Sequence, residues 1–183
     1  TLNSVIGRLK LETTDIDNTP DQIVYTLTSV PGTGWLRLNG MLLINGGTFT
    51  QADINANLLT YDHNDAEVFT DSFSFSVDDG SGTSTSGSFA LTITPVNDNT
   101  PIMTSNGGPA DAALNIAENS TAVTTVMATD ADLPTQTLTF NIVGGLDAGR
   151  FTIVSGSGVL TFATAQDFEN PTDSNADNVY EVI

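Results

Sequence analysis

The alternation of apolar and polar residues is the feature that most constrains how this chain can fold. Ile23, Tyr25 and Leu27 alternate with polar neighbours, and residues 73–77 repeat the pattern. Successive side chains of a β-strand point to opposite faces, so a period of two predicts strands with one buried face. Short strands separated by Gly, Asn, Asp and Pro are typical of β-sandwiches. Further strands are predicted at 89–93 and 138–142, and a hairpin at 151–154 and 159–162.

The two halves of the chain are diverged copies of one pattern. The segment Thr-Asp-Ile-Asp at 14–17 precedes one alternating strand, and Thr-Asp-Ala-Asp at 129–132 precedes another. Proline cannot donate to a sheet ladder, so pairing should stop near Pro95 and restart after Pro101. We therefore expect an all-β protein of two tandem Greek-key sandwiches joined by a short linker. The expected domains are 1–97, without its first strand, and 98–183, without its last.

The charge balance excludes several classes of partner. The chain has 22 acidic and 4 basic residues, a formal net charge of −18. Nucleic acids and anionic membrane surfaces require a basic footprint, so neither is an expected partner. No apolar run is long enough to cross a bilayer, so we expect no membrane insertion of this segment. Two explanations of the charge stay open, namely solubility and a set of divalent-cation sites.

The composition also bears on chemistry. There is no cysteine, which excludes disulfides, thiolate metal sites and a cysteine nucleophile. Glycoside hydrolysis needs two carboxylates that face one cleft. Nothing in the spacing of the acids selects such a pair, so we do not expect an enzyme.

The linker itself carries candidate ligands. Asn97, Asp98 and Asn99 lie between the two prolines. Carboxylate and amide oxygens are the ligands that hard cations such as Ca²⁺ prefer. The sequence therefore predicts a cation site at the junction of the two domains.

Short motifs in both halves resemble the cadherin superfamily. The first half resembles the cadherin-like repeat of chondroitin-sulfate proteoglycans and bacterial surface proteins, and the second resembles a cadherin domain of the bacterial type. The motifs of the first half are Asp-Ile-Asp-Asn at 15–18, Phe-Thr-Gln-Ala-Asp-Ile at 49–54, Tyr-Asp-His at 61–63 and the segment 71–80. Those of the second half are Ala-Glu-Asn at 117–119, Ala-Thr-Asp-Ala-Asp at 128–132, Asp-Phe-Glu at 167–169 and Asn-Val-Tyr-Glu-Val at 178–182.

The resemblance implies calcium between consecutive domains, bound by the base of one, the linker and the top of the next. For the central junction it implies Asp53 at the base of the first domain, Asn97, Asp98 and Asn99 in the linker, and Asp130 and Asp132 at the top of the second. Glu118, Asp167 and Glu169 would form a site at the bottom of the second domain. Asp15, Asp17 and Asp78 would serve a junction with a preceding domain.

The departures from the family pattern reduce the expected number of ions. Pro95 stands where the linker usually opens with an acid, and Asp53 stands alone in place of a two-acid motif. We therefore expect one or two ions at the central junction and an incomplete bottom site.

One further acidic segment has two interpretations. Asp-Ser-Asn-Ala-Asp at 173–177 matches the start of an EF-hand calcium loop. Asn178 replaces the Gly of position 6, position 12 lies past the last residue, and strands replace the usual helices. We interpret this segment as an ordinary loop.

These observations predict a calcium-rigidified structural and adhesion module of a large bacterial cell-surface or secreted repeat protein, located outside the cell. Its partners would be neighbouring repeats and a homophilic, glycan or protein partner on a cell surface. The alternative is a carbohydrate-binding module in which aromatic rings stack on sugars. Its platforms would be Trp35, Tyr25 or Tyr61.

Overall fold

The computed structural model describes residues 4–108 and 111–183. The chain divides into two compact units, Thr1–Pro95 and Val96–Ile183. The predicted boundary between residues 97 and 98 falls two residues after this division.

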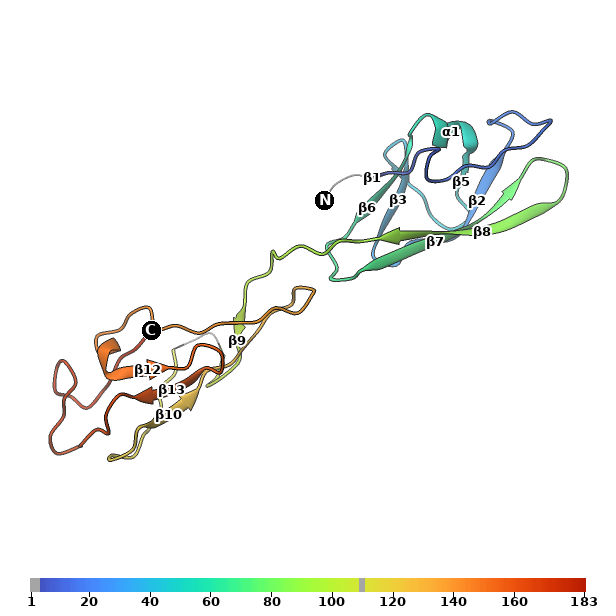
Figure 1. The fold of residues 1–183 in the computed structure, drawn as a ribbon. Helices are drawn as coiled ribbons and strands as arrows, with labels where there is room; N and C mark the ends of the chain where they lie inside the picture. The colour runs from blue at the N-terminus through green and yellow to red at the C-terminus, as the bar shows by residue number, and fades with distance from the viewer. Residues whose placement is uncertain (1–3, 109–110) are drawn as a thin grey trace. The chain divides into compact units, whose positions relative to one another are not determined.

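The first unit is a sandwich of two four-stranded antiparallel sheets (Figure 1). One sheet has the order β1-β6-β3-β4 and the other β5-β2-β7-β8. Its strands are β1 (Ser4–Val5), β2 (Val24–Ser29), β3 (Gly34–Leu38), β4 (Met41–Leu42), β5 (Thr48–Thr50), β6 (Leu59–His63), β7 (Thr70–Asp78) and β8 (Ser84–Thr92). A short helix, α1 (Gln51–Asn55), connects β5 to β6 and so joins the two sheets.

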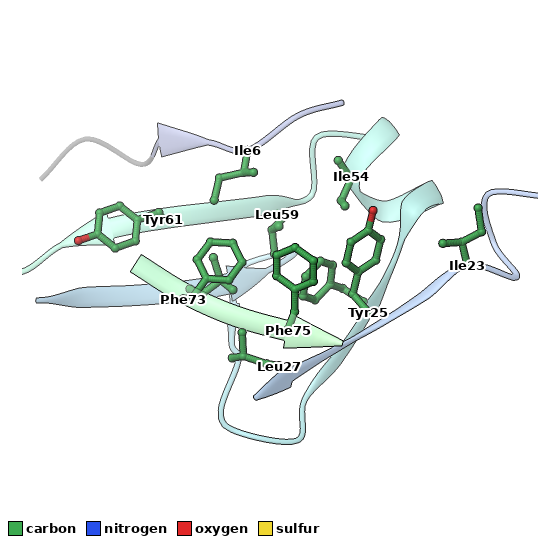
Figure 2. Close-up of a cluster of buried hydrophobic side chains, with 11 residues drawn as sticks. Ile6, Ile23, Tyr25, Leu27, Ile54, Leu59, Tyr61, Phe73 and Phe75 are labelled. Carbon is green, nitrogen blue, oxygen red and sulfur yellow. The ribbon is translucent and has the colours of Figure 1, made fainter. Parts of the chain in front are cut away.

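The alternation of the sequence builds the core of this unit. Tyr25 and Leu27 in β2, and Phe73 and Phe75 in β7, turn their side chains to the interior because they lie two residues apart on paired strands. Figure 2 shows these residues packed together with side chains of the facing sheet. The buried members are Ile6, Ile23, Tyr25, Leu27, Leu36, Phe49, Ile54, Leu59, Tyr61, Phe73 and Phe75.

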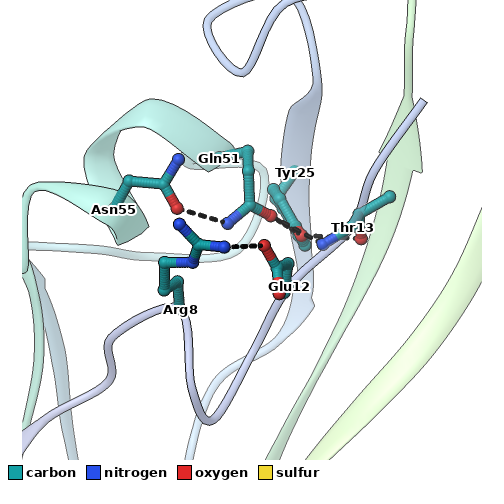
Figure 3. A network of polar contacts seen from close by, with 6 residues as sticks. All are labelled: Arg8, Glu12, Thr13, Tyr25, Gln51 and Asn55. Atoms are coloured by element: carbon teal, nitrogen blue, oxygen red, sulfur yellow. Dashed lines mark hydrogen bonds and ion pairs between the residues drawn. The ribbon is translucent and has the colours of Figure 1, made fainter. Parts of the chain in front are cut away.

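A polar network closes the core where β2 begins. The Tyr25 hydroxyl lies 2.7 Å from Gln51 Oε1 and 2.7 Å from Thr13 Oγ1 (Figure 3). Gln51 Oε1 also accepts the Thr13 N–H, and Gln51 Nε2 donates to Asn55. Burial raises the pKa of Tyr25 above its ordinary value, so the hydroxyl stays neutral in this network.

The second unit is also all-β, with shorter strands. A three-stranded sheet has the order β10-β13-β12, and β9 pairs with β11. The strands are β9 (Ile102–Met103), β10 (Ala122–Thr125), β11 (Ala128–Thr129), β12 (Phe151–Ile153) and β13 (Val159–Phe162), and a 3₁₀ turn covers Ala148–Arg150. Phe151, Leu160 and Phe162 form its buried core, with half-buried apolar side chains around them.

The predicted hairpin of this unit is present. β12 and β13 pair antiparallel from Phe151↔Phe162 to Ile153↔Leu160. Gly158 closes the turn with a φ of +68° and accepts the Val126 N–H on its carbonyl. A side chain at Gly158 would collide with the Val126 carbonyl, so the turn requires glycine here.

The prediction of a strand at 138–142 was wrong. Leu138, Phe140 and Ile142 are half-buried and alternate with exposed residues, as a strand would require, but no ladder is assigned there. Phe140 donates to Ser155, whereas Val143 donates to Ile183, so the backbone changes partner within a few residues. The alternation of apolar and polar residues indicates which side chains are buried. A segment forms a strand only where its backbone makes successive hydrogen bonds to one neighbouring strand.

Among the residues that the structure describes, no helix is long and apolar enough to cross a bilayer.

Candidate metal centre

The linker and the Asp130–Asp132 turn are brought together by one short pairing. β9 follows the linker and pairs with β11, with Ile102 opposite Thr129. Thr129 is the last residue of β11, so the turn that follows it lies beside the residues that precede Ile102. The predicted grouping of Asp98 and Asn99 with Asp130 and Asp132 is therefore present within the second unit.

Asp132 is the centre of this group. Its side chain is only 2% exposed. Its Oδ1 accepts the N–H of Asn99 (3.1 Å), the Nδ2 of Asn99 (2.7 Å) and the N–H of Asp98 (3.4 Å). The Asp132 N–H donates to Asp130 Oδ1 (2.9 Å), which joins the two acids of the turn.

The other oxygen of Asp132 is the unusual atom of the site. Asp132 Oδ2 is buried and has no hydrogen-bond partner. A buried carboxylate oxygen without a partner costs about 1–3 kcal/mol or more, so such atoms normally face water or an ion. The Asp98 and Asp130 carboxylates and the Asn99 side-chain amide lie beside Asp132, and such residues supply the oxygen ligands that fit a hard cation.

Hydrogen bonds keep this carboxylate charged. The Asn99 amide holds the pKa of Asp132 below its ordinary value, aided by the backbone N–H groups of Asn99 and Asp98 and opposed by burial. A cation ligand must be deprotonated, so this environment prepares Asp132 to bind one.

Asn97 takes a different position from its neighbours. Its Nδ2 donates to Gln136 Oε1 (2.8 Å), so the Asn97 side chain is directed toward Gln136, away from the predicted ligands. No sequence signal singled out Gln136, because its role depends on the path of the loop after Asp132.

A second carboxylate group forms in the same unit. One carboxylate oxygen from each of Glu118, Asp167 and Glu169 lies within 4.8 Å of the other two. Glu118 Oε2 accepts the Phe168 N–H (3.2 Å), and Asp167 Oδ1 accepts the Glu169 N–H (3.0 Å). The Asn119 N–H donates to the Gln166 carbonyl and fixes the two segments side by side. All three acids are exposed, in contrast to Asp132.

The predicted place of Asp53 was wrong. Asp53 follows Thr50, which pairs with Val24, and Val24 pairs with Asp78. This is the end of the sheet opposite Thr92, from which the chain leaves toward the linker. Asp53 instead caps α1, where its Oδ2 accepts the Thr50 N–H (2.8 Å) and its own N–H donates to Thr50 Oγ1 (3.1 Å).

The predicted group of Asp15, Asp17 and Asp78 is partly assembled. Asp15 Oδ1 accepts the N–H groups of Asp17 and Asn18, and Asn18 Nδ2 donates to the carbonyl of Asp79, next to Asp78. Asp15 and Asp17 are exposed. A hydrogen bond between their side chains lowers the pKa of Asp15 and raises that of Asp17, so the pair shares a proton more readily than separate acids would.

The aromatic platform of the alternative interpretation is not assembled as predicted. Tyr25 is 0% and Tyr61 3% exposed, because both belong to the core of the first unit. Trp35 is 44% exposed and is the one predicted platform that solvent reaches.

Two consecutive β-sandwich units with acidic turns at their ends define a class of modular repeat proteins. The Cadherin-like family profile matches residues 2–93, which is half of the chain. The chain therefore belongs to the cadherin-like family. The more specific pairing of a proteoglycan-type repeat with a bacterial-type domain stays a prediction.

Relatives and solved structures agree with this assignment. The chain is 33% identical over 147 residues to the human extracellular matrix organizing protein FRAS1, covering 77% of this chain and 4% of that protein. It is 29% identical over 178 residues to human FRAS1-related extracellular matrix protein 2, covering 88% of this chain and 6% of that protein. The chain thus spans a small fraction of these relatives. Their names confirm the predicted extracellular location.

The crystal structure of mouse Cadherin-23 EC22-24 superposes with a TM-score of 0.51 at 23% identity, covering 85% of this chain and 46% of that chain. This likeness concerns the fold. It confirms the predicted all-β, cadherin-like sandwich class.

Proposed function

We propose that this extracellular module binds calcium at the Asp98–Asp132 group and that the ion stiffens the linker. The observation that carries the proposal is Asp132 Oδ2, a buried carboxylate oxygen without a partner beside Asp98 and Asp130. Asp98, Asp130 and Asp132 would supply carboxylate ligands, with amide oxygen from Asn99. A bound divalent ion supplies positive charge that neutralises the repulsion among these acids.

The mechanical consequence follows from which residues share the site. Asp98 and Asn99 belong to the linker, whereas Asp130 and Asp132 belong to a turn after β11. An ion held by both segments restricts the linker and hence the movement of the first unit against the second. This is the role expected of a structural module between neighbouring repeats.

The exposed group of Glu118, Asp167 and Glu169 is a second proposed site. Its backbone contacts hold the three carboxylates together without an ion. Since the acids are exposed, we expect weaker binding here than at Asp132. The adhesion partner, homophilic contacts and a bacterial origin stay predictions.

Calorimetric titration with CaCl₂ tests the main site. Extracellular calcium modules bind with Kd values of about 10⁻⁴ to 10⁻³ M, so millimolar calcium is needed. Asp132→Asn should remove one binding event, whereas Asp21→Asn, which removes an exposed acid outside these groups, should retain it. Equal titrations for the wild type and Asp132→Asn would contradict the proposal.

The linker needs a separate measurement, because binding alone does not show stiffening. Amide ¹⁵N relaxation at Asp98 and Asn99 should report ordering when calcium replaces a chelator. Unchanged relaxation at a saturated site would mean that the ion binds but does not stiffen the linker.

A second candidate function, glycan binding, rests on Trp35 alone. Trp35 lies opposite Asp62 in the β3–β6 pairing, and the Arg37 Nε bonds Asp62 Oδ2 at 2.7 Å. An exposed indole next to charged hydrogen-bonding groups is the arrangement that stacks on a sugar ring. A glycan array on which wild type and Trp35→Ala give the same signals would remove this candidate.

A further inference from the structure

A third acidic segment of the second unit carries the same physical signature as Asp132. Asp173 is 7% exposed, and its Oδ1 is buried without a hydrogen-bond partner. Among residues 4–108 and 111–183, Asp132 Oδ2 and Asp173 Oδ1 are the two carboxylate oxygens in this condition. The other oxygen of Asp173 accepts the Asp177 N–H at 2.8 Å, so the carboxylate faces its own loop.

The loop places oxygen-bearing side chains at alternate positions. Asp173, Asn175 and Asp177 stand at positions 1, 3 and 5 of the pattern that wraps a calcium ion in EF-hand loops. Asn175 Nδ2 lies 2.9 Å from Asp177 Oδ2, so the third and fifth positions already meet. An Asn amide carries an acceptor oxygen opposite its NH₂ group, and a half-turn about its last bond would present that oxygen as a ligand.

The backbone removes the main objection to this pattern. An EF-hand loop has Gly at position 6 because the chain turns sharply there. Asn178 holds this position with a φ of +63°. Asn tolerates the left-handed conformation better than most residues, so it makes the turn that Gly would make.

The loop is anchored from outside. Asp147 is buried, and its Oδ1 accepts both the N–H (2.7 Å) and the Oγ (2.8 Å) of Ser174. Its Oδ2 accepts the Glu181 N–H at 3.0 Å. A single carboxylate thus ties both sides of the loop. Ser174 follows Asp173 directly, so the backbone next to the first ligand position is fixed without an ion.

We propose that residues 173–178 form an additional calcium site, with Asp173, Asn175 and Asp177 as side-chain ligands. The site shares no ligand with the Asp98–Asp132 group or with the Glu118 group, although Asn178 Nδ2 donates to the Phe168 carbonyl next to the latter. Three side-chain ligands supply only part of the oxygen shell that Ca²⁺ requires, and water completes it, so the affinity is that of a weak extracellular site, about 10⁻⁴ to 10⁻³ M.

The test is a CaCl₂ titration of the full chain followed by ¹H–¹⁵N correlation spectra. The Asp177 N–H donates to Asp173 and the Val179 N–H to Asp177, so both amides report on the ligand carboxylates. We expect both resonances to shift and saturate in the millimolar range. Asp173→Asn should weaken this response on the order of tenfold or more, because ligand charge sets affinity. Asp177→Asn gives a second reading if Asp173→Asn does not fold.

Two controls separate this site from its neighbours. Glu169→Gln removes a carboxylate of the Glu118 group and should leave the loop response intact. Asn178→Gly retains the positive φ without a side chain and should also retain binding.

Loop amides that do not move up to about 10 mM calcium, or that move equally in Asp173→Asn, would overturn the proposal. Water would then be the partner of Asp173. The amides of Asp98 and Asn99 are read in the same spectra, so the failure of one site is distinguished from that of the other.

Discussion

The two Thr-Asp-x-Asp turns share a sequence pattern and differ in what surrounds them. In the first unit, Asp15 accepts N–H groups from its own turn, and both acids are exposed. In the second unit, Asp132 is buried and accepts N–H groups from Asp98 and Asn99, a different segment of the chain. The motif alone therefore does not make a site. The β9–β11 pairing does, since it lays a polar linker across the turn.

The hydrophobic core, in contrast to the acidic turn, is more extensively buried in the first unit than in the second. Among the described residues, eleven are buried in the core of the first unit and three in that of the second. Apolar burial is the dominant favourable term in folding. The first unit should therefore owe its stability to its core, whereas the second should depend more on polar contacts and bound ions.

Removing a core ring should affect the first unit most. Phe73 is fully buried, stacked on Phe89 with ring centroids 5.2 Å apart. Phe73→Ala should lower the free energy of unfolding of this unit by about 3–5 kcal/mol, with or without calcium. Denaturation followed by fluorescence of Trp35, the single tryptophan, reports on this unit alone. Phe69→Ala, at an exposed ring, is the control and should change little.

Calcium should stabilise the second unit through Asp132. At calcium concentrations of about 10 to 100 times Kd, the native state gains about 1.4 to 2.7 kcal/mol. Scanning calorimetry should show a calcium-dependent gain in the wild type, and Asp132→Asn should lose the part that this one site contributes. Asp17→Asn changes the equivalent position of the exposed turn and should retain most of it. Equal losses in both variants would mean that burial does not distinguish the two turns.

Tyr61 should make the first unit sensitive to alkali. Burial and a hydrogen bond to Asp71 raise the pKa of Tyr61 to about 12. Because the pKa of Tyr61 is higher in the folded than in the unfolded state, its neutral hydroxyl stabilises the fold. This contribution is complete at pH values below the unfolded pKa, near 10, and is lost as the pH rises through about 12. Tyr61→Phe should cost about 1.5 kcal/mol at neutral pH, because Asp71 loses a donor. The free energy of unfolding, measured by urea denaturation between pH 8 and 12, should then fall less steeply with pH in the variant than in the wild type.

An equally steep alkaline loss in Tyr61→Phe would assign the effect to other groups. Absorbance at 295 nm gives an independent reading, because the wild type should show a tyrosine that titrates near pH 12 and Tyr61→Phe should lack it.

The sequence predicted the features that depend on local patterns. Alternation located β2, β7 and β8 of the first unit, and the hairpin predicted at 151–154 and 159–162 is present as β12 and β13. The acids of the second unit were also grouped correctly, since Glu118 does meet Asp167 and Glu169. What it missed depends on distant contacts. The burial of Asp132, the partner of Asn97 and the anchoring of Ser174 by Asp147 all arise from contacts between segments that lie at least 27 residues apart in the sequence.

Asp53 shows how a correct motif can lead to a wrong role, and it gives the smallest predicted effect. The Phe-Thr-Gln-Ala-Asp segment predicted a ligand, yet Thr50 and Asp53 form a capping box at α1. Asp53→Ala and Thr50→Ala should therefore each lower the free energy of unfolding of the first unit by about 1 kcal/mol. Thr50→Ala removes the acceptor of the Asp53 N–H, and Asp53→Ala removes the acceptor of the Thr50 N–H. Trp35 fluorescence measures this loss. Calcium binding should be the same in both variants as in the wild type, since Asp53 lies at the end of its sheet away from Thr92. A calorimetric titration in which Asp53→Ala alone loses a calcium ion would restore Asp53 as a ligand, and would mean that the capping box is a secondary role of that side chain.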